Sequence, residues 1–316
     1  MNVLSLSYGK DSLACFGACE ELGIKIDRVV HAEVWATDDI PADLPPMVEF
    51  KKKADRIIKD RWGLDVEHVC ATVSPDRKYG TLTHTHTHTH RLSYEDVFYS
   101  RRAKGKFEGT ITGWPMLRSA WCKHLKYDEK DIYRCLLSDD KERGERKTGG
   151  VSRVAYGEDA VVQLRAEDGS TKKIQSSSDV AILGIAADEE ERIARHSKDP
   201  KKLLPLVEIG WTEAECRKWC EERDLLSPIY TTATRGGCWF CHNQGIGQLR
   251  ILRKQYPELW AIMLKWDEDS PVWFKPNHVS VHDIDERLRM EEEGIDMTNF
   301  RWEWVKTGVG GQYSLW

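Results

Sequence analysis

Two cysteines stand two residues apart in a glycine-containing stretch of the C-terminal part of the chain. Residues 235–244 read RGGCWFCHNQ, which places Cys238 and Cys241 in a C-x-x-C pattern. Such a pair can bind a metal ion, hold an iron–sulfur cluster or act as a redox dithiol. A thioredoxin-like dithiol belongs at the start of a helix after an early strand, which disfavours that use here. The neighbouring His242 leaves a mixed zinc site open.

A second stretch, close to the N-terminus, is suited to binding an anion. Residues 5–12 read SLSYGKDS and lie between an apolar run and a helical pattern. Gly9 allows a tight turn, and the first turn of a helix offers free N–H groups and a positive dipole end. Ser7 and Ser12 add hydroxyl donors, and Lys10 adds a positive charge. The stretch therefore predicts a site for a pyrophosphate or sulfate-like anion, although it is not a Walker A loop.

A histidine repeat is the third stretch with metal-binding side chains. Residues 81–90 read TLTHTHTHTH, and the four histidines would share one side of an extended chain. They could bind a transition metal. Because low-complexity stretches are also typical of exposed, variable loops, we favour the loop interpretation.

The first half of the chain alternates strand-like with helix-like segments. Such alternation predicts βαβ units and a parallel sheet, hence an α/β domain. The strand-like segments are residues 3–6, 26–36, 66–73 and 179–185, and the helical ones are residues 11–23 and 47–63.

Residues from about 138 to 177 interrupt this pattern. The first part is polar and rich in charge, and residues 160–174 alternate around Asp168-Gly169. Alternation around Asp-Gly is typical of a β-hairpin. We expect an insertion that carries a hairpin.

The pattern becomes mainly helical after Pro205. Thr212 and Glu215 have the spacing of a capping box that opens a helix. We therefore expect an α/β domain over residues 1–200, followed by a helical region over residues 201–316 that carries the C-x-x-C pair.

Charge and composition limit the class of protein. The formal net charge is −5, so no overall positive field attracts nucleic acid. Three basic stretches could still guide a nucleic-acid backbone: FKKK at 50–53, RRAKGK at 101–106 and LRILRK at 249–254. No apolar run approaches the roughly twenty residues of a membrane span, and the N-terminus lacks a signal-peptide pattern. With nine scattered cysteines and no disulfide framework, we expect a cytoplasmic protein without a membrane partner.

Four motifs together resemble a known family. SYGKDS is similar to the PP-loop pattern S-x-G-x-D-S of the adenine nucleotide alpha-hydrolase superfamily. RSAWCKHLKY (118–127), GIAADEEERIAR (184–195) and GGCWFCHNQ are similar to segments of the phosphoadenosine phosphosulfate (PAPS) reductase family. The resemblance covers nearly the whole chain except the histidine repeat and the insertion. It implies a Rossmann-like parallel sheet with helices on both faces that binds ATP or an adenylyl sulfate.

The resemblance also implies site residues. Lys126 matches the lysine of the family's C-x-x-L-K pattern, and Arg192 matches the arginine of its G-I-x-x-D-E-x-x-R pattern. Both would neutralise phosphate charge, and with Asp11 they are the candidate catalytic residues. The candidate phosphate-binding residues are Ser7, Tyr8, Gly9, Lys10, Asp11 and Ser12.

Partners for the C-x-x-C pair come from the same resemblance. In relatives that hold a cluster, a cysteine at the position of Cys122 faces the pair, and Cys220 is a fourth candidate, with Cys216 as its rival. Four thiolates suit a [4Fe–4S] cluster or tetrahedral zinc. The resemblance favours the iron–sulfur cluster, with zinc as the alternative. Mg²⁺ is expected to accompany ATP.

The resemblance leaves the reaction open. Sulfonucleotide reductases carry a nucleophilic cysteine near the C-terminus, whereas no cysteine follows Cys241 here. Reductases with a cluster also have adjacent cysteines where this chain has Trp121 and Cys122. Both differences favour the branch that cleaves ATP to AMP and pyrophosphate and transfers sulfur, here to a nucleic-acid-linked acceptor with a sulfur donor protein as a further partner. The alternatives are an adenylyl sulfate (APS or PAPS) reductase and a non-catalytic, nucleotide-binding accessory protein of a phage or CRISPR-type defence system.

Overall fold

The chain divides into two compact units. The computed structural model describes residues 1–70, 93–101, 108–115, 122, 161–165, 171–175, 180–231 and 237–307. The first unit comprises Met1–Tyr94 and Lys123–Gly237, and the second comprises Glu95–Cys122 and Cys238–Trp316. The division after Gly237 differs from the expected one near residue 200, because the helices that follow Pro205 pack on the N-terminal helix. The histidine repeat at 81–90 lies outside the described residues.

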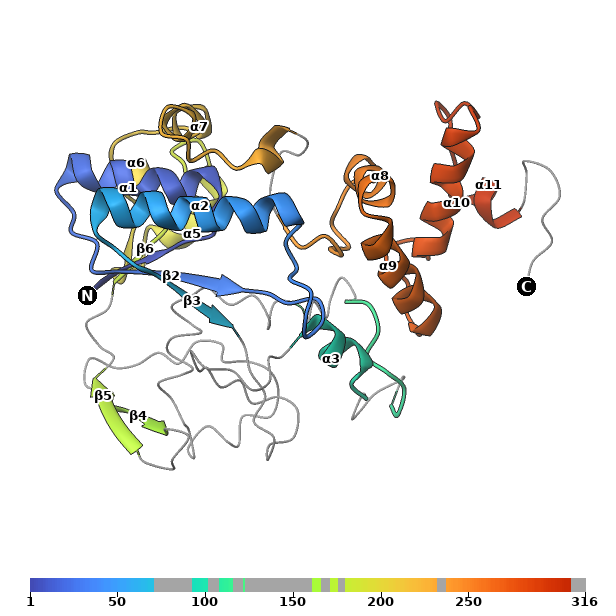
Figure 1. The fold of residues 1–316 in the computed structure, drawn as a ribbon, viewed down its shortest axis with the longest axis horizontal. Helices are drawn as coiled ribbons and strands as arrows, with labels where there is room; N and C mark the ends of the chain where they lie inside the picture. The colour runs from blue at the N-terminus through green and yellow to red at the C-terminus, as the bar shows by residue number, and fades with distance from the viewer. Residues whose placement is uncertain are drawn as a thin grey trace. The chain divides into compact units, whose positions relative to one another are not determined.

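A five-stranded parallel sheet forms the centre of the first unit (Figure 1). Leu4 of β1 lies opposite Val29 of β2 on one side and Ile182 of β6 on the other. These three side chains are fully buried, as is usual where helices cover a parallel sheet. The predicted α/β class with a parallel sheet is confirmed. The strands are β1 (Asn2–Ser5), β2 (Arg28–Glu33), β3 (Val66–Cys70), β6 (Val180–Ile182) and β7 (Lys202–Leu203).

The direction of strand addition reverses within this sheet. The order is β3-β2-β1-β6-β7, so the chain first builds outward from β1 to β3 and later adds β6 and β7 on the other side of β1. In open parallel sheets, ligands bind at the carboxyl ends of the two strands where the order reverses. The predicted anion-binding stretch directly follows β1 and therefore lies at this point.

The helices of the first unit begin and end where the local signals indicate. α1 and α2 stop at Gly23 and Gly63, whose φ angles of 65° and 69° favour glycine. The predicted capping box opens α7: Glu215 N–H bonds to the Thr212 hydroxyl, and Thr212 N–H bonds to the Glu215 carboxylate. The helices are α1 (Lys10–Leu22), α2 (Pro45–Trp62), α5 (Glu190–His196), α6 (Pro205–Glu208), α7 (Glu213–Glu221) and the 3-10 turn η2 (Pro228–Thr231).

α1 packs against α6 and α7 in the core of the first unit (Figure 1). A methyl group on Gly17 of α1 would lie 2.3 Å from Nε1 of Trp219 on α7, so only glycine allows this approach. The core also contains four cysteines that are at most 2% exposed: Cys15, Cys19, Cys216 and Cys220. Burial raises the pKa of these thiols, to about 12 for Cys19 and Cys216. Cys15 and Cys19 are therefore core residues.

The insertion contains the expected hairpin. β4 (Val161–Arg165) and β5 (Thr171–Gln175) pair antiparallel, with Val161 opposite Gln175 and Arg165 opposite Thr171. Asp168, Gly169 and most of the insertion lie outside the described residues.

The second unit is helical and has an aromatic core. Pro257 stands at the first position of α9 (Pro257–Asp269), directly after α8 (Ile246–Gln255), where proline is well tolerated. Trp239 stacks on Trp266 with ring centroids 5.8 Å apart and planes 12° from parallel, and both side chains are buried. The other helices are α3 (Tyr94–Tyr99), α10 (Val281–Glu292) and α11 (Trp302–Thr307). Among the described residues, no helix combines the length and apolar character needed to cross a membrane.

Candidate functional site

The loop between β1 and α1 turns sharply at Tyr8. Leu6 extends the strand pairing by donating its N–H to Val30 O at 2.9 Å. Tyr8 then takes a φ of 55°, and Gly9 follows as the N-cap of α1. A left-handed conformation costs a non-glycine residue about 1–2 kcal/mol, so other contacts must hold Tyr8 in place.

Ser7 and Ser12, the two predicted hydroxyl donors, close the loop on itself. Ser12 Oγ accepts from Ser7 N at 3.2 Å and donates to Gly9 O at 3.0 Å. Ser7 Oγ lies 3.1 Å from Ser12 Oγ and accepts from Gly9 N at 3.4 Å. The structure brings these residues together as expected, and both hydroxyls stabilise the turn.

Three other segments fix the start of α1. The backbone N–H of Lys10 donates to the hydroxyl of Tyr230 at 3.1 Å, and Cys220 Sγ donates to Lys10 O at 3.2 Å. A Cβ atom on Gly184, in the segment after β6, would lie 2.5 Å from Ser12 N. Only glycine allows the chain after β6 to approach the first turn of α1 this closely.

The side chain of Lys10 lies among carboxylates. Its Nζ is 2.7 Å from Asp11 Oδ1 and 3.2 Å from Glu213 Oε2, and the residue is only 9% exposed. Burial alone would lower the pKa of Lys10, but the two carboxylates outweigh it and raise the pKa. Lys10 therefore stays charged and neutralises acidic groups.

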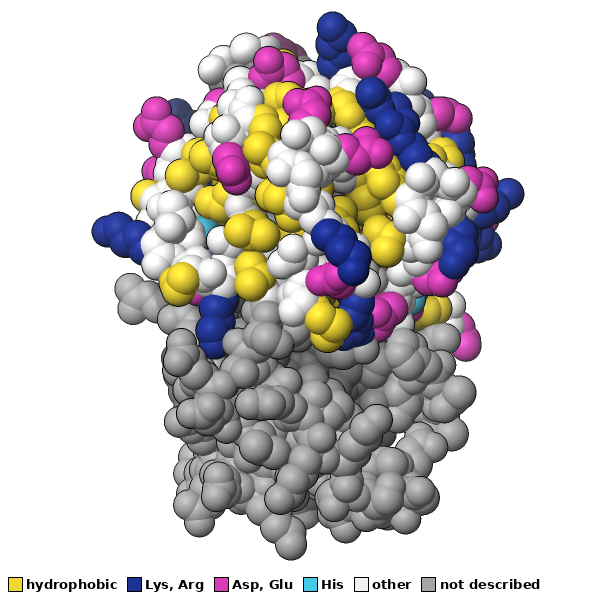
Figure 2. All heavy atoms as spheres, turned by 90° about the vertical axis from the view of Figure 1, so that its left-hand side faces the viewer, with side chains coloured by type: hydrophobic (Ala, Val, Ile, Leu, Met, Phe, Trp, Pro, Cys, Tyr) yellow, Lys and Arg dark blue, Asp and Glu magenta, His cyan; other side chains and the backbone are white. Residues whose placement is uncertain are grey.

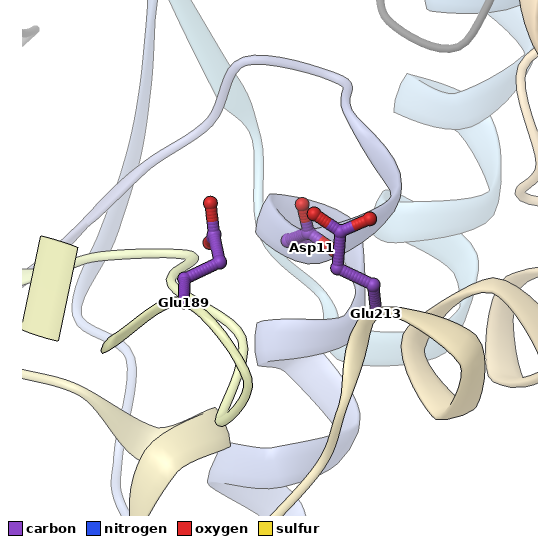
Figure 3. Close-up of side chains that lie close together, drawn as sticks. All are labelled: Asp11, Glu189 and Glu213. Carbon is purple, nitrogen blue, oxygen red and sulfur yellow. The ribbon is translucent and has the colours of Figure 1, made fainter. Parts of the chain in front are cut away.

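Asp11, Glu189 and Glu213 form a cluster of carboxylates (Figure 3). One oxygen from each lies within 4.8 Å of the others. Asp11 comes from the first turn of α1, Glu189 precedes α5, and Glu213 begins α7. Burial raises the pKa of Asp11, Lys10 opposes this, and Glu213 and Glu189 add to it. Lys10 compensates part of this negative charge, and Mg²⁺ prefers oxygen ligands of this kind.

Arg192 lies beside the same cluster. Its guanidinium donates to both oxygens of Glu189, at 2.6 and 2.7 Å, and Glu189 Oε2 also accepts from Ala186 N at 3.1 Å. Of the predicted catalytic residues, Arg192 is thus bonded to Glu189, whose carboxylate lies near that of Asp11. The third, Lys126, lies outside the described residues.

Glu213 is a site residue that sequence reasoning missed. Acidic residues are common in the first turn of a helix because they complement its dipole, so Glu213 carried no distinct signal. Glu189 stands in the matched segment 184–195, as the glutamate of the pattern whose arginine is Arg192. The pattern could therefore have identified Glu189 as a candidate site residue. It could not have shown that Glu189 lies near Asp11 of α1.

In the second unit, the two residues between Cys238 and Cys241 anchor the C-x-x-C turn. Trp239 and Phe240 are buried and pack on Trp266. Cys241 N donates to Cys238 O at 3.0 Å, which closes the turn, and both cysteines are half-buried. The aromatic pair thus holds the turn at the edge of the core.

A lysine stabilises the chain just after this turn. Lys275 Nζ donates to the carbonyl groups of His242 at 2.8 Å and Gln244 at 2.6 Å. Burial lowers the pKa of Lys275, while Cys241 opposes this. Burial and Lys275 both lower the pKa of His242, which favours the neutral imidazole that a metal ligand requires.

The four predicted thiolates are divided between the two units. Cys122, Cys238 and Cys241 belong to the second unit, whereas Cys220 lies in the core of the first. Among the described side chains, the group of three that could hold a metal is the acidic one, without a cysteine. Metal binding by the cysteines stays a prediction, and the contact with Lys10 favours a structural role for Cys220.

Most of the described side chains of the basic stretches pair with acidic groups. In 50–53, Lys51 pairs with Asp43, Lys52 with Glu49 and Lys53 with Asp224. In 249–254, Arg250 pairs with Glu291, and Arg253 pairs with Asp285 and Glu292. Figure 2 shows basic and acidic side chains interspersed on the described part of one face. These cations pair within their own units, and residues 102–106 lie outside the described part.

Comparisons with known proteins add no relative. No family model matches the chain, and no similar curated protein or solved structure was found.

The charge balance of the cluster can be tested with Lys10→Met. Removing the ammonium leaves Asp11 and Glu213 uncompensated, which is expected to cost about 1–3 kcal/mol of unfolding free energy at neutral pH. When folding raises the pKa of a carboxyl group, the folded protein becomes less stable as the pH rises through that pKa. The loss of unfolding free energy in Lys10→Met should therefore grow between about pH 4 and pH 7. Urea denaturation of both proteins at several pH values measures it.

Lys52→Met is the matched control, because it removes an exposed ion pair with Glu49. Its effect should stay within about 0.5 kcal/mol at every pH. A Lys10→Met deficit that is independent of pH would contradict the proposed charge balance.

Proposed function

We propose that the first unit is a Rossmann-like domain that binds an adenine nucleotide, ATP or an adenylyl sulfate, with its phosphates at the start of α1. The observation that carries the proposal is the reversal of strand order between β1 and β6, with the turn of residues 6–9 at this point. Ligands of open parallel sheets bind at such a reversal, and helix starts favour phosphate groups.

The residues at the start of α1 supply the donors that such a ligand needs. Among the described residues, the backbone N–H groups of Tyr8 and Asp11 have no hydrogen-bond acceptor. Lys10 and Arg192 provide positive charge beside them. Positive charge placed in advance stabilises the negative charge that develops on a leaving pyrophosphate.

Asp11, Glu189 and Glu213 are the residues that would hold Mg²⁺. Their donors are hard oxygen atoms from three separate elements, which fits this ion. Bound there, Mg²⁺ would supply further positive charge for phosphate oxygens.

The reaction we propose is cleavage of ATP to AMP and pyrophosphate during sulfur transfer to a nucleic-acid-linked acceptor. The C-x-x-C turn supports a thiolate site in the second unit, where Cys238, Cys241 and Cys122 would hold a [4Fe–4S] cluster or zinc. A sulfur donor protein would be a further partner. Adenylyl sulfate reduction is less well supported, because residues 242–316 contain no cysteine that could act as a nucleophile.

A second candidate function is binding of a nucleotide without turnover, as in an accessory protein. One observation favours it: Lys10 and Arg192 are both already paired with carboxylates. The two functions differ in whether AMP and pyrophosphate appear when the protein is incubated with MgATP and an acceptor.

Nucleotide binding can be tested by titration calorimetry with MgATP. In Gly184→Ala, a methyl group would displace the first turn of α1, and we expect the dissociation constant to rise at least about tenfold, or 1.4 kcal/mol. Gly247→Ala on α8 is the control, since its nearest neighbour would be the Arg250 guanidinium at 4.0 Å. Failure of the native protein to bind ATP, AMP or an adenylyl sulfate, or unchanged affinity in Gly184→Ala, would contradict the proposal.

Metal content tests the thiolate site. We expect protein purified without oxygen to carry iron with acid-labile sulfide, or zinc, and to lose the metal in Cys238→Ser and Cys241→Ser. Cys216→Ser is the control and should keep it, because Cys216 is a core thiol. Cys220→Ser should also keep the metal if its contact with Lys10 is structural. Metal-free native protein would rule the site out.

A further inference from the structure

The tyrosine of the β1–α1 loop reaches into a buried polar network. Tyr8 is fully buried, and its hydroxyl donates to Asp55 of α2 and lies 3.1 Å from Nε2 of His68 on β3. Its ring packs edge-to-face on His31 with centroids 4.7 Å apart, and the Lys51 ammonium lies 5.3 Å from the ring centroid. Tyr8 thus combines an unfavourable backbone conformation with a buried side chain that forms hydrogen bonds.

His31 holds the same loop at a second point. Its Nδ1 lies 2.7 Å from Leu6 O, and its Nε2 lies 2.8 Å from Lys51 Nζ. Because an ammonium group only donates, Nε2 is the acceptor, and Nδ1–H donates to Leu6 O. Lys51 also donates to Asp43 at 2.5 Å, which completes this branch of the network.

His68 is positively charged at the centre of the other branch. Its Nε2 lies 2.9 Å from Asp55 and its Nδ1 lies 3.0 Å from Glu33, so both ring nitrogens face carboxylates. Burial lowers the pKa of His68, but the two carboxylates outweigh it and raise the pKa to about 9. His68 also holds Asp55 in the position where it accepts from Tyr8.

We propose that Tyr8 is the positioning residue of this loop: its hydroxyl, bonded to Asp55 beside His68, holds residue 8 in the left-handed conformation. A hydrogen bond to a carboxylate is about twice as strong as one between neutral groups, so it can outweigh the backbone strain. The anchor then fixes the direction of the loop before any ligand arrives. That this loop receives phosphate rests on the proposed function; the anchoring itself does not.

Hydrogen exchange of the ligand-free protein tests the anchor directly. In Tyr8→Phe we expect the amides of residues 6–12 to exchange about tenfold faster, because the loop opens more often without its charge-assisted bond. Tyr99→Phe is the matched control: it removes a tyrosine–carboxylate bond to Asp269 in the second unit. Unchanged exchange in Tyr8→Phe would overturn the proposal, as would equal acceleration in Tyr99→Phe.

Asp55→Asn keeps the shape and an acceptor for Tyr8 but removes the charge, so it remains informative if Tyr8→Phe does not fold. We expect amide exchange to accelerate less than in Tyr8→Phe and only in residues 6–12; no acceleration would count against the anchor.

MgATP affinity separates this inference from the proposed function. Faster exchange with unchanged MgATP affinity would support the anchor and contradict phosphate binding by the loop, whereas unchanged exchange in a protein that binds MgATP would contradict the anchor alone.

Discussion

The ammonium group of Lys10 allows a carboxylate of α7 to lie beside one of α1 at the start of α1. It lies between Asp11 and Glu213 in a nearly buried position, where unbalanced negative charge would be costly. The backbone of the same residue is bonded to Tyr230 and Cys220. Charge balance, the start of the helix and the packing of α7 on α1 are therefore linked at one residue.

The loop before α1 is supported on two sides. On one side, Gly184 lets the chain after β6 lie against the first turn of the helix. On the other, Tyr8 is bonded into a network that includes Asp55 and His68. Such support fixes the backbone donors in advance, which would lower the entropic cost of binding the proposed ligand.

The parts of the structure that could be predicted from the sequence depend on local signals. The parallel sheet follows from alternating apolar runs and helices, and the Thr212 capping box and Pro257 mark helix ends through their own chemistry. The parts that could not be predicted depend on distant partners. The division after Gly237 reflects the packing of Trp219 against Gly17, and the role of Glu213 depends on α7 lying beside α1.

The roles of the cysteines likewise could not be predicted from local sequence. Cys216 and Cys220 lie one helical turn apart, and their spacing says nothing of whether they face a metal or a core. The contact of Cys220 with Lys10 O comes from the packing of α7 on α1. Tyr8 is similar, because its left-handed conformation is unfavourable for tyrosine locally and requires Asp55 from α2.

The central claim is that an adenine nucleotide places its phosphates at the reversal between β1 and β6. The most direct measurement is hydrogen exchange of the native protein with and without saturating MgATP, resolved by peptide. The account predicts slower exchange in residues 6–13 and 183–192, the segments that follow β1 and β6. Protection confined to other segments, such as α9 at Pro257–Asp269, or no protection at all, would contradict it.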